Sequence, residues 1–125
     1  MINLTKRQIL LLHKSLVEEF GGLCGVRDEN LLDLSLNSSY QTFLGEDLYK
    51  GNINKIVHLG FSLIKNHPFI DGNKRIGTHV LLVLLELNGY SLEYSQKELI
   101  EIILSISASE KTEKDLLAWV KNHIL

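Results

Sequence analysis

The sequence has few of the residues that crosslink small extracellular proteins or break helices. Its 125 residues include one cysteine, Cys24, and one proline, Pro68. A single cysteine can form neither an internal disulfide nor a zinc site by itself, so we expect a reducing, intracellular environment. Because proline ends helices, its near absence, together with many Leu, Ile, Glu and Lys residues, favours a helical fold.

An excess of one charge and a long hydrophobic run are also missing. Thirteen basic and fifteen acidic residues leave a formal net charge of −2, whereas nucleic-acid-binding domains normally carry a basic surface. The longest apolar run, residues 80–85, is far shorter than the roughly 20 residues of a membrane span, and the N-terminus lacks a secretory-signal pattern. We therefore expect a cytoplasmic protein that binds neither membrane nor nucleic acid directly.

The sequence does contain a succession of helix signals, over a length that suits one domain, residues 1–125. Capping residues, helical spacing of apolar residues and glycine stops predict about six helices, which start near residues 5, 29, 52, 73, 95 and 112. The fourth is apolar on nearly all sides and is expected at the centre of the core. Between residues 38 and 51, aromatic residues separated by polar ones predict a short flap loop or hairpin. The predicted fold class is all-α.

The strongest functional signal is the segment 67–75, which reads HPFIDGNKR. His67 precedes Pro68, which disfavours helical geometry at His67. A neutral imidazole can accept a hydroxyl proton near pH 7, so we interpret His67 as a general base; alone, it would be taken for a residue that caps the preceding helix. Asp71 could cap the next helix or bind magnesium, and the cations that follow favour the metal role.

An anion site is predicted directly after Asp71. Gly72 lets the backbone turn so that successive N–H groups, including that of Asn73, point into one concavity at a helix N-terminus. Lys74 and Arg75 lie in the first turn of this helix, where acidic residues are normally favoured. Two cations there are unfavourable unless an anion balances them. Arg75 can bind two phosphate oxygens at once, and Lys74 supplies a point charge.

This segment resembles the signature of the Fic/Doc family, His-Pro-Phe-x-Asp/Glu-Gly-Asn-Gly/Lys-Arg. Every fixed position matches, and Lys74 is typical of the Doc (death-on-curing) branch, the toxin half of type II toxin–antitoxin pairs. The resemblance continues at residues 20–28 and at the Asn88-Gly89 helix end. Ile76-Gly77 stands where this branch usually has Thr-Ala, and a glycine in the first part of a helix carries a modest cost.

The resemblance implies the helical Fic fold and transfer from ATP, with Mg²⁺, to a protein hydroxyl. For Doc-like members it implies phosphoryl transfer to a threonine of elongation factor Tu, which halts translation. For most Fic enzymes it implies AMP transfer. His67 would be the base, Arg75 would also act in catalysis, and Asp71 would bind magnesium. The residues expected to bind the nucleotide are Gly72, Asn73, Lys74 and Arg75.

The resemblance also implies two protein-binding regions. Edge-strand pairing by a flap that includes Thr42, Phe43 and Tyr49 would dock the target segment. A cognate antitoxin would occupy the groove beside the site. Since Ser15 to Glu19 is the nearest approach to the inhibitory helix motif of Fic proteins and lacks its final residue, inhibition is expected from a partner.

Three other interpretations remain open. Arg7 and His13 have the spacing of a HEPN-type ribonuclease toxin, although such loose spacing recurs by chance. A Fic-like adaptor that has lost catalysis would be the non-enzymatic case. A metal hydrolase would gather three histidines and one aspartate, namely His58, His67, His79 and Asp71.

Overall fold

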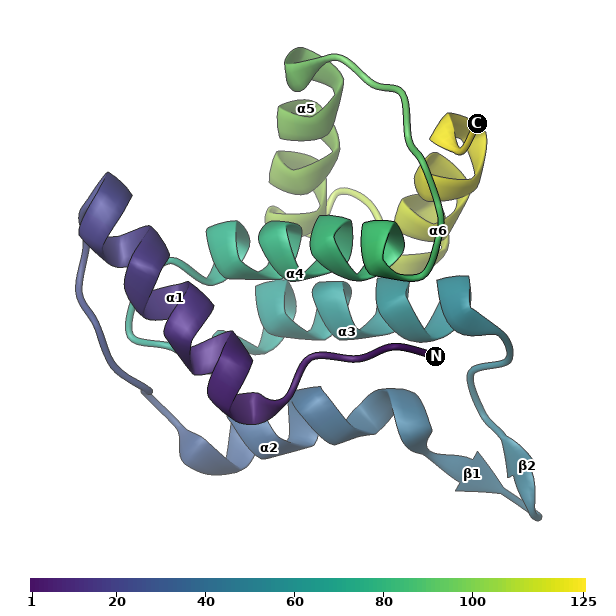
Figure 1. The fold of residues 1–125 in the computed structure, drawn as a ribbon, viewed down its shortest axis with the longest axis horizontal. Coiled ribbons are helices and arrows are strands. Elements are labelled where there is room, and N and C mark those ends of the chain that lie inside the picture. Colours follow the sequence, from purple (N-terminus) through teal and green to yellow (C-terminus); the bar gives the residue numbers. More distant parts are fainter.

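The computed structural model describes all 125 residues. The chain forms six α-helices, one 3₁₀ turn and one small hairpin, joined by loops (Figure 1). The elements, in chain order, are α1 (Lys6–Phe20), α2 (Glu29–Asn37), η1 (Ser38–Tyr40), β1 (Thr42–Phe43), β2 (Glu46–Asp47), α3 (Asn52–Asn66), α4 (Asn73–Leu87), α5 (Gln96–Ser107) and α6 (Glu113–His123). The predicted all-α fold is confirmed. No helix combines the length and hydropathy that crossing a bilayer requires.

Local hydrogen bonds explain where most helices begin. In α1, α2, α5 and α6 a side chain that precedes the helix accepts a bond from the backbone N–H three residues further on, which satisfies a donor that the helix leaves without a partner. These capping residues are Thr5, Asp28, Ser95 and Thr112. In contrast, α3 and α4 follow Gly51 and Gly72 and have no capping side chain.

Helices α3 and α4 run antiparallel through the middle of the molecule, and the other four helices surround them (Figure 1). Of the 19 buried apolar residues in the core, α3 and α4 contribute five each. The predicted central position of α4 is confirmed, since Val80, Leu81, Leu84 and Leu85 are fully buried. This central pair carries the functional segment, because the loop between the two helices contains residues 67–72.

The two central helices approach each other closely at a pair of glycines, Gly60 in α3 and Gly77 in α4. A Cβ atom on Gly77 would lie 2.6 Å from Cγ1 of Ile64 and 3.0 Å from the carbonyl oxygen of Gly60. The sequence alone shows only that Gly77 replaces the alanine that is usual in the Doc branch. The structure gives it a packing reason, because any side chain there would collide with α3.

The predicted flap is a two-stranded antiparallel hairpin. Its paired residues are Thr42 with Asp47 and Phe43 with Glu46. The side chain of Phe43 is 69% exposed. Tyr49 lies beyond the second strand and stacks on His58 of α3, with ring centroids 3.9 Å apart. Tyr49 therefore anchors the base of the hairpin to α3.

Candidate functional site

The loop between α3 and α4 begins with an unusual backbone conformation. His67 has φ 48° and ψ 55°, the left-handed region, which agrees with the expectation that the following proline disfavours the geometry of a right-handed helix. Its side chain is exposed. Phe69, two residues later, is 1% exposed, so it anchors the loop in the core. The loop thus presents His67 to solvent while Phe69 holds it down.

The segment after α1 fixes the same loop through backbone contacts. Val26 pairs with Phe69 in an isolated antiparallel bridge, and the Arg27 N–H donates to the Pro68 carbonyl at 2.8 Å. The Arg27 guanidinium donates to the carbonyl of His67 at 2.7 Å and to that of the last residue of α3 at 3.1 Å. A cation suits these carbonyls, because they lie at a helix C-terminus. Contacts from the segment after α1 therefore hold the backbone of His67 in place.

The buried side chain of Asn73 bonds to the backbone across the loop. Its Oδ1 accepts a hydrogen bond from the Phe69 N–H at 2.9 Å, and its Nδ2 donates to the Phe69 carbonyl at 3.1 Å. The residue is only 7% exposed. The sequence predicts that Asn73 contributes to the anion site; its side-chain amide is already engaged, which leaves its backbone N–H as the group for an anion.

The Asp71 side chain lies at the start of α4 but does not cap this helix, since Gly72 is the N-cap residue and has no side chain to bond. The Asp71 Oδ1 accepts from the N–H of Gly72 at 2.8 Å, and Oδ2 accepts from the N–H of Leu23 at 3.2 Å. A Cβ on Gly22, where φ is +109°, would lie 2.6 Å from Asp71 Oδ2. Glycine at position 22 therefore permits the close approach of this segment to the carboxylate.

No group of three or more His, Cys, Asp or Glu side chains is arranged to hold a metal ion. The four residues that a metal hydrolase would need form no such group, and one of them, His58, bonds instead to Glu113 at 2.7 Å. A single carboxylate nevertheless fits magnesium when phosphate oxygens and water complete the coordination. Asp71 is exposed, and its two oxygens keep lone pairs beyond the two bonds that they accept.

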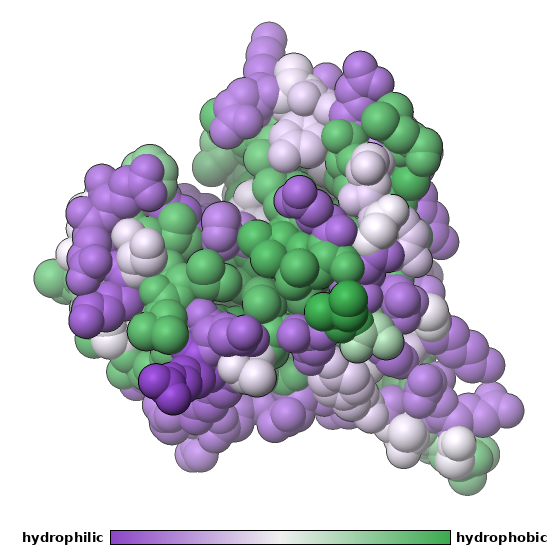
Figure 2. Space-filling model, viewed as in Figure 1, coloured by the Kyte–Doolittle hydropathy of each residue, from purple (hydrophilic) through white to green (hydrophobic).

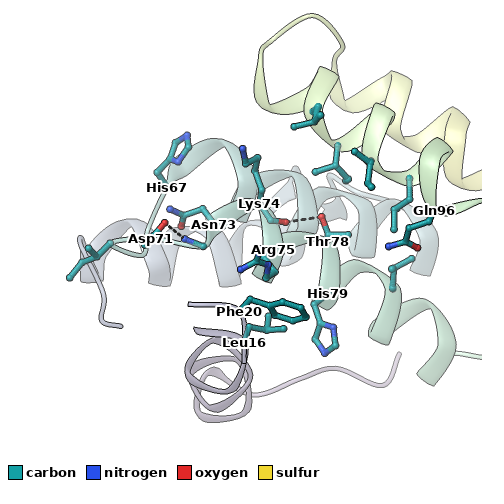
Figure 3. Close-up of a pocket in the computed structure, with 17 residues that line it drawn as sticks. Leu16, Phe20, His67, Asp71, Asn73, Lys74, Arg75, Thr78, His79 and Gln96 are labelled. Atoms are coloured by element: carbon teal, nitrogen blue, oxygen red, sulfur yellow. Dashed lines mark hydrogen bonds between the residues drawn. The ribbon is translucent and has the colours of Figure 1, made fainter. Parts of the chain in front are cut away.

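The first turn of α4 carries Lys74 and Arg75, with no acidic residue and no capping side chain. Its first N–H groups lack intrahelical partners, and the helix dipole adds partial positive charge. The two side chains diverge: Lys74 extends on the side of His67, whereas the Arg75 guanidinium lies 4.6 Å from the ring centroid of Phe20 in α1 (Figure 3). Such a concentration of donors and positive charge suits an anion.

A cleft of about 780 Å³ opens beside this turn, between α1, α4 and α5. The loop and the first turn of α4 form its polar end. Its apolar wall comes from Leu16, Phe20, Leu82, Ile100, Ile103 and Leu104. Figure 2 shows hydrophobic surface in the hollow between α1 and α5. The volume and the mixture of apolar wall and few polar groups are typical of a small-molecule site.

The hairpin is not part of this cleft. None of residues 42–49 lines it, and the hairpin precedes α3 whereas His67 follows it (Figure 1). A helix of 15 residues separates the two by about 22 Å. The structure therefore does not bring Thr42 and Phe43 to His67, and target docking by these residues stays a prediction, for a substrate large enough to reach both places.

One contact to the loop cannot be read from the sequence. His13 of α1 is 3% exposed; its ring stacks on Phe69 with centroids 3.9 Å apart, and its Nε2 lies 2.7 Å from the Asp71 carbonyl oxygen. Burial and this bond remove the exposed base that the ribonuclease interpretation requires. The spacing of His13 with Ile9 and Val17, four residues to either side, is the signal that places it on the inner face of α1.

The sequence profile of the Fic/DOC family matches residues 3–85, which include α1 to α3, the loop and most of α4. The chain therefore belongs to the Fic/DOC family. It is also similar to Toxin Doc of Mycolicibacterium smegmatis, with 38% identity over 73 residues, 58% of this chain and 56% of that protein. The aligned part thus spans just over half the length of this relative.

Proposed function

We propose that this chain is the toxin of a toxin–antitoxin pair, and that it transfers the terminal phosphate of ATP to a hydroxyl of a translation protein. The observation that carries the proposal is the junction of the loop with α4. There an exposed histidine, His67, adjoins a helix N-terminus that has two cations and no capping side chain. Membership of the Fic/DOC family and the similarity to Toxin Doc support it.

In the proposed reaction His67 is the general base. One imidazole nitrogen accepts the proton of the target hydroxyl, whose oxygen attacks the terminal phosphorus of ATP. A new O–P bond forms as the bond between this phosphorus and the ADP oxygen breaks, and ADP leaves. Since phosphoryl transfer depends mainly on positioning and charge stabilisation, Arg75 and Lys74 contribute by binding phosphate oxygens at the start of α4.

Two further residues complete the proposed site. The exposed Asp71 carboxylate would hold magnesium, which when bound neutralises charge on phosphate oxygens. Gly72 supplies the left-handed turn, with φ 74°, that lets the N–H groups of the helix start face the anion. Removal of magnesium by a chelator is accordingly expected to stop transfer.

Lys74 supports phosphoryl transfer over transfer of AMP. At this position the Fic/Doc signature has glycine or lysine, and AMP transfer is implied for members with glycine. A lysine side chain occupies space at the anion site and adds a charge there, so a bound nucleotide would be oriented differently. We propose elongation factor Tu, through a threonine hydroxyl, as the substrate, in line with the resemblance to the Doc branch.

The apolar wall of the cleft supports restraint by an antitoxin. Phe20, Ile100 and Leu104 are 56%, 51% and 52% exposed, which is costly for large apolar side chains unless a partner covers them. A partner seated on these residues would lie directly beside the phosphate-binding end of the cleft. It would therefore block the nucleotide as well as the target.

The intact mass of elongation factor Tu, after incubation with this chain, ATP and magnesium, tests the reaction. We expect an increase of one phosphoryl group. An increase of one AMP group would overturn the phosphoryl assignment and retain the transferase. The His67→Ala variant should add nothing and should no longer arrest growth in cells without the antitoxin. His79→Ala is the matched control, because His79 lines the same cleft and has no proposed role. Undiminished growth arrest by His67→Ala would refute the assignment of His67 as the general base.

A further inference from the structure

We propose, on the basis of the function proposed above, that His13 of α1 is a positioning residue for the loop that carries the general base and the magnesium ligand. It does not touch the substrate. It sets the backbone from Phe69 to Gly72 before a nucleotide binds. The assignment comes from two contacts of one buried side chain with both ends of a single turn.

The first contact is packing. The imidazole ring of His13 lies nearly parallel to the ring of Phe69, with an interplanar angle of 14° and centroids 3.9 Å apart. It also lies close beneath Gly72, where a Cβ atom would be 3.5 Å from His13 Nε2. The imidazole therefore fills the space between the anchor of the loop and its turn.

The second contact is a hydrogen bond that fixes a peptide orientation. A carbonyl oxygen can only accept, so Nε2 of His13 carries the proton and donates to the Asp71 carbonyl at 2.7 Å. In a trans peptide unit the C=O and the following N–H point in opposite directions. With its carbonyl turned towards α1, this unit directs the N–H of Gly72 away from α1.

The orientation of that N–H has a chemical consequence. The N–H of Gly72 donates to Oδ1 of Asp71 at 2.8 Å and so holds the carboxylate in place. His13 thus acts on the Asp71 carboxylate indirectly. It orients the peptide unit between Asp71 and Gly72, this peptide orients the carboxylate, and the carboxylate would bind the metal ion. A residue that only filled the core would need the ring and no donor.

Two variants separate the donor from the ring. His13→Phe keeps an aromatic ring on Phe69 and removes the N–H donor, whereas His13→Gln keeps an amide N–H at a similar reach and removes the ring. Amide hydrogen exchange of peptides that cover residues 66–76 is measured in the full chain without nucleotide, with α6 as the internal reference. Phosphoryl transfer is measured in parallel as the dependence of rate on ATP concentration.

For His13→Phe we expect about tenfold faster exchange in the loop, since the lost bond corresponds to about one factor of ten, with unchanged exchange in α6. Transfer should fall about tenfold, mainly in kcat, and His13→Gln should recover most of both. Loop exchange and transfer within about twofold of the parent in a folded His13→Phe chain would overturn the proposal. If His13→Phe does not fold, the His13→Gln variant tests the proposal instead. Loop exchange and transfer close to those of the parent chain would support the proposal, and tenfold changes in both would overturn it.

The exchange measurement also separates this assignment from the proposed reaction, because it involves neither nucleotide nor target. Faster loop exchange in His13→Phe, together with a parent chain that transfers nothing, would refute the reaction and leave His13 as a positioning residue. Unchanged loop exchange, together with a parent chain that phosphorylates its target, would refute the role of His13 and leave the reaction.

Discussion

Among single residues, His67 stands in a conformation that L-amino acids with a side chain rarely adopt. Its φ of 48° places it in the left-handed region, where crowding of the Cβ atom against the backbone costs about 1–2 kcal/mol. The bonds from Arg27 and the burial of Phe69 hold it there. Strain at a candidate general base is consistent with a position selected for chemistry at some cost to stability.

Two replacements of His67, by asparagine and by alanine, should therefore differ in stability, while both end the proposed transfer. Asparagine, like histidine, tolerates the left-handed region better than most residues, so we expect the free energy of unfolding, measured with urea, to be about 0.5–1 kcal/mol higher for His67→Asn than for His67→Ala. His67→Ala is the control, since alanine loses the imidazole and keeps the strain. Equal stability of the two variants would mean that the conformation at position 67 carries no cost.

For whole elements, the contact between Gly60 and Gly77 sets how closely α3 and α4 pack. In a solvent-exposed helix, Gly→Ala stabilises by about 1 kcal/mol. At position 77 the sign should reverse, because the new Cβ would lie 2.6 Å from Ile64 Cγ1. We expect Gly77→Ala to lower the free energy of unfolding by about 1–3 kcal/mol.

A second substitution tests the cause of that loss. Ile64→Ala removes the atom that the new Cβ would meet, so in a double-mutant cycle the combined loss should be smaller than the sum of the two single losses. Strict additivity would show that the collision with Ile64 is not the source. Gly60→Ala offers a graded comparison, with its nearest neighbour, the Leu81 Cβ, at 3.1 Å.

The elements themselves were largely predictable, whereas the frame of the site was not. Caps such as Thr5 and Ser95 act within one turn, so sequence alone locates the helix starts. The motif places Asn73 in the anion site, but its side chain bonds across the loop to Phe69. Contacts from Arg27 and His13 join residues far apart in the chain, and periodicity carries no record of which distant residues meet.

For the molecule as a whole, the C-terminal end of α6 is bonded to the first turn of α5. His123 places Nε2 2.6 Å from Glu98 Oε2 and Nδ1 2.6 Å from the Trp119 carbonyl oxygen. The bond to the Trp119 carbonyl and then the bond to Glu98 raise the pKa of His123 above 6.5. The bond from His123, followed by those from Ser95, lowers the pKa of Glu98 below 4.5.

These shifts predict the pH dependence of global stability. The raised pKa of His123 contributes stability that is complete below about pH 6.5 and is lost as pH rises through the folded-state value. The lowered pKa of Glu98 contributes stability that is present above about pH 4.5 and is lost as pH falls. The pair therefore stabilises most between these values.

Urea unfolding of the parent chain at a series of pH values measures this window. We expect the free energy of unfolding to decrease from about pH 6 towards pH 8, and less so in high salt, because the Glu98 side chain is 48% exposed and its charge is screened. In His123→Gln the decrease over this range should shrink. A decrease of the same size in His123→Gln would assign it to other groups.

The contacts that hold the loop also determine when it can form. The bond from His13 to the Asp71 carbonyl spans 58 positions of the chain, and that from Arg27 to the His67 carbonyl spans 40. Closing such long stretches costs chain entropy that only the docked helices repay. A chain with its helices formed but α1 still undocked would have an unformed turn before α4. Under the function proposed above, newly synthesised protein would become active only once its tertiary structure is complete, which would give an inhibitory partner time to bind first.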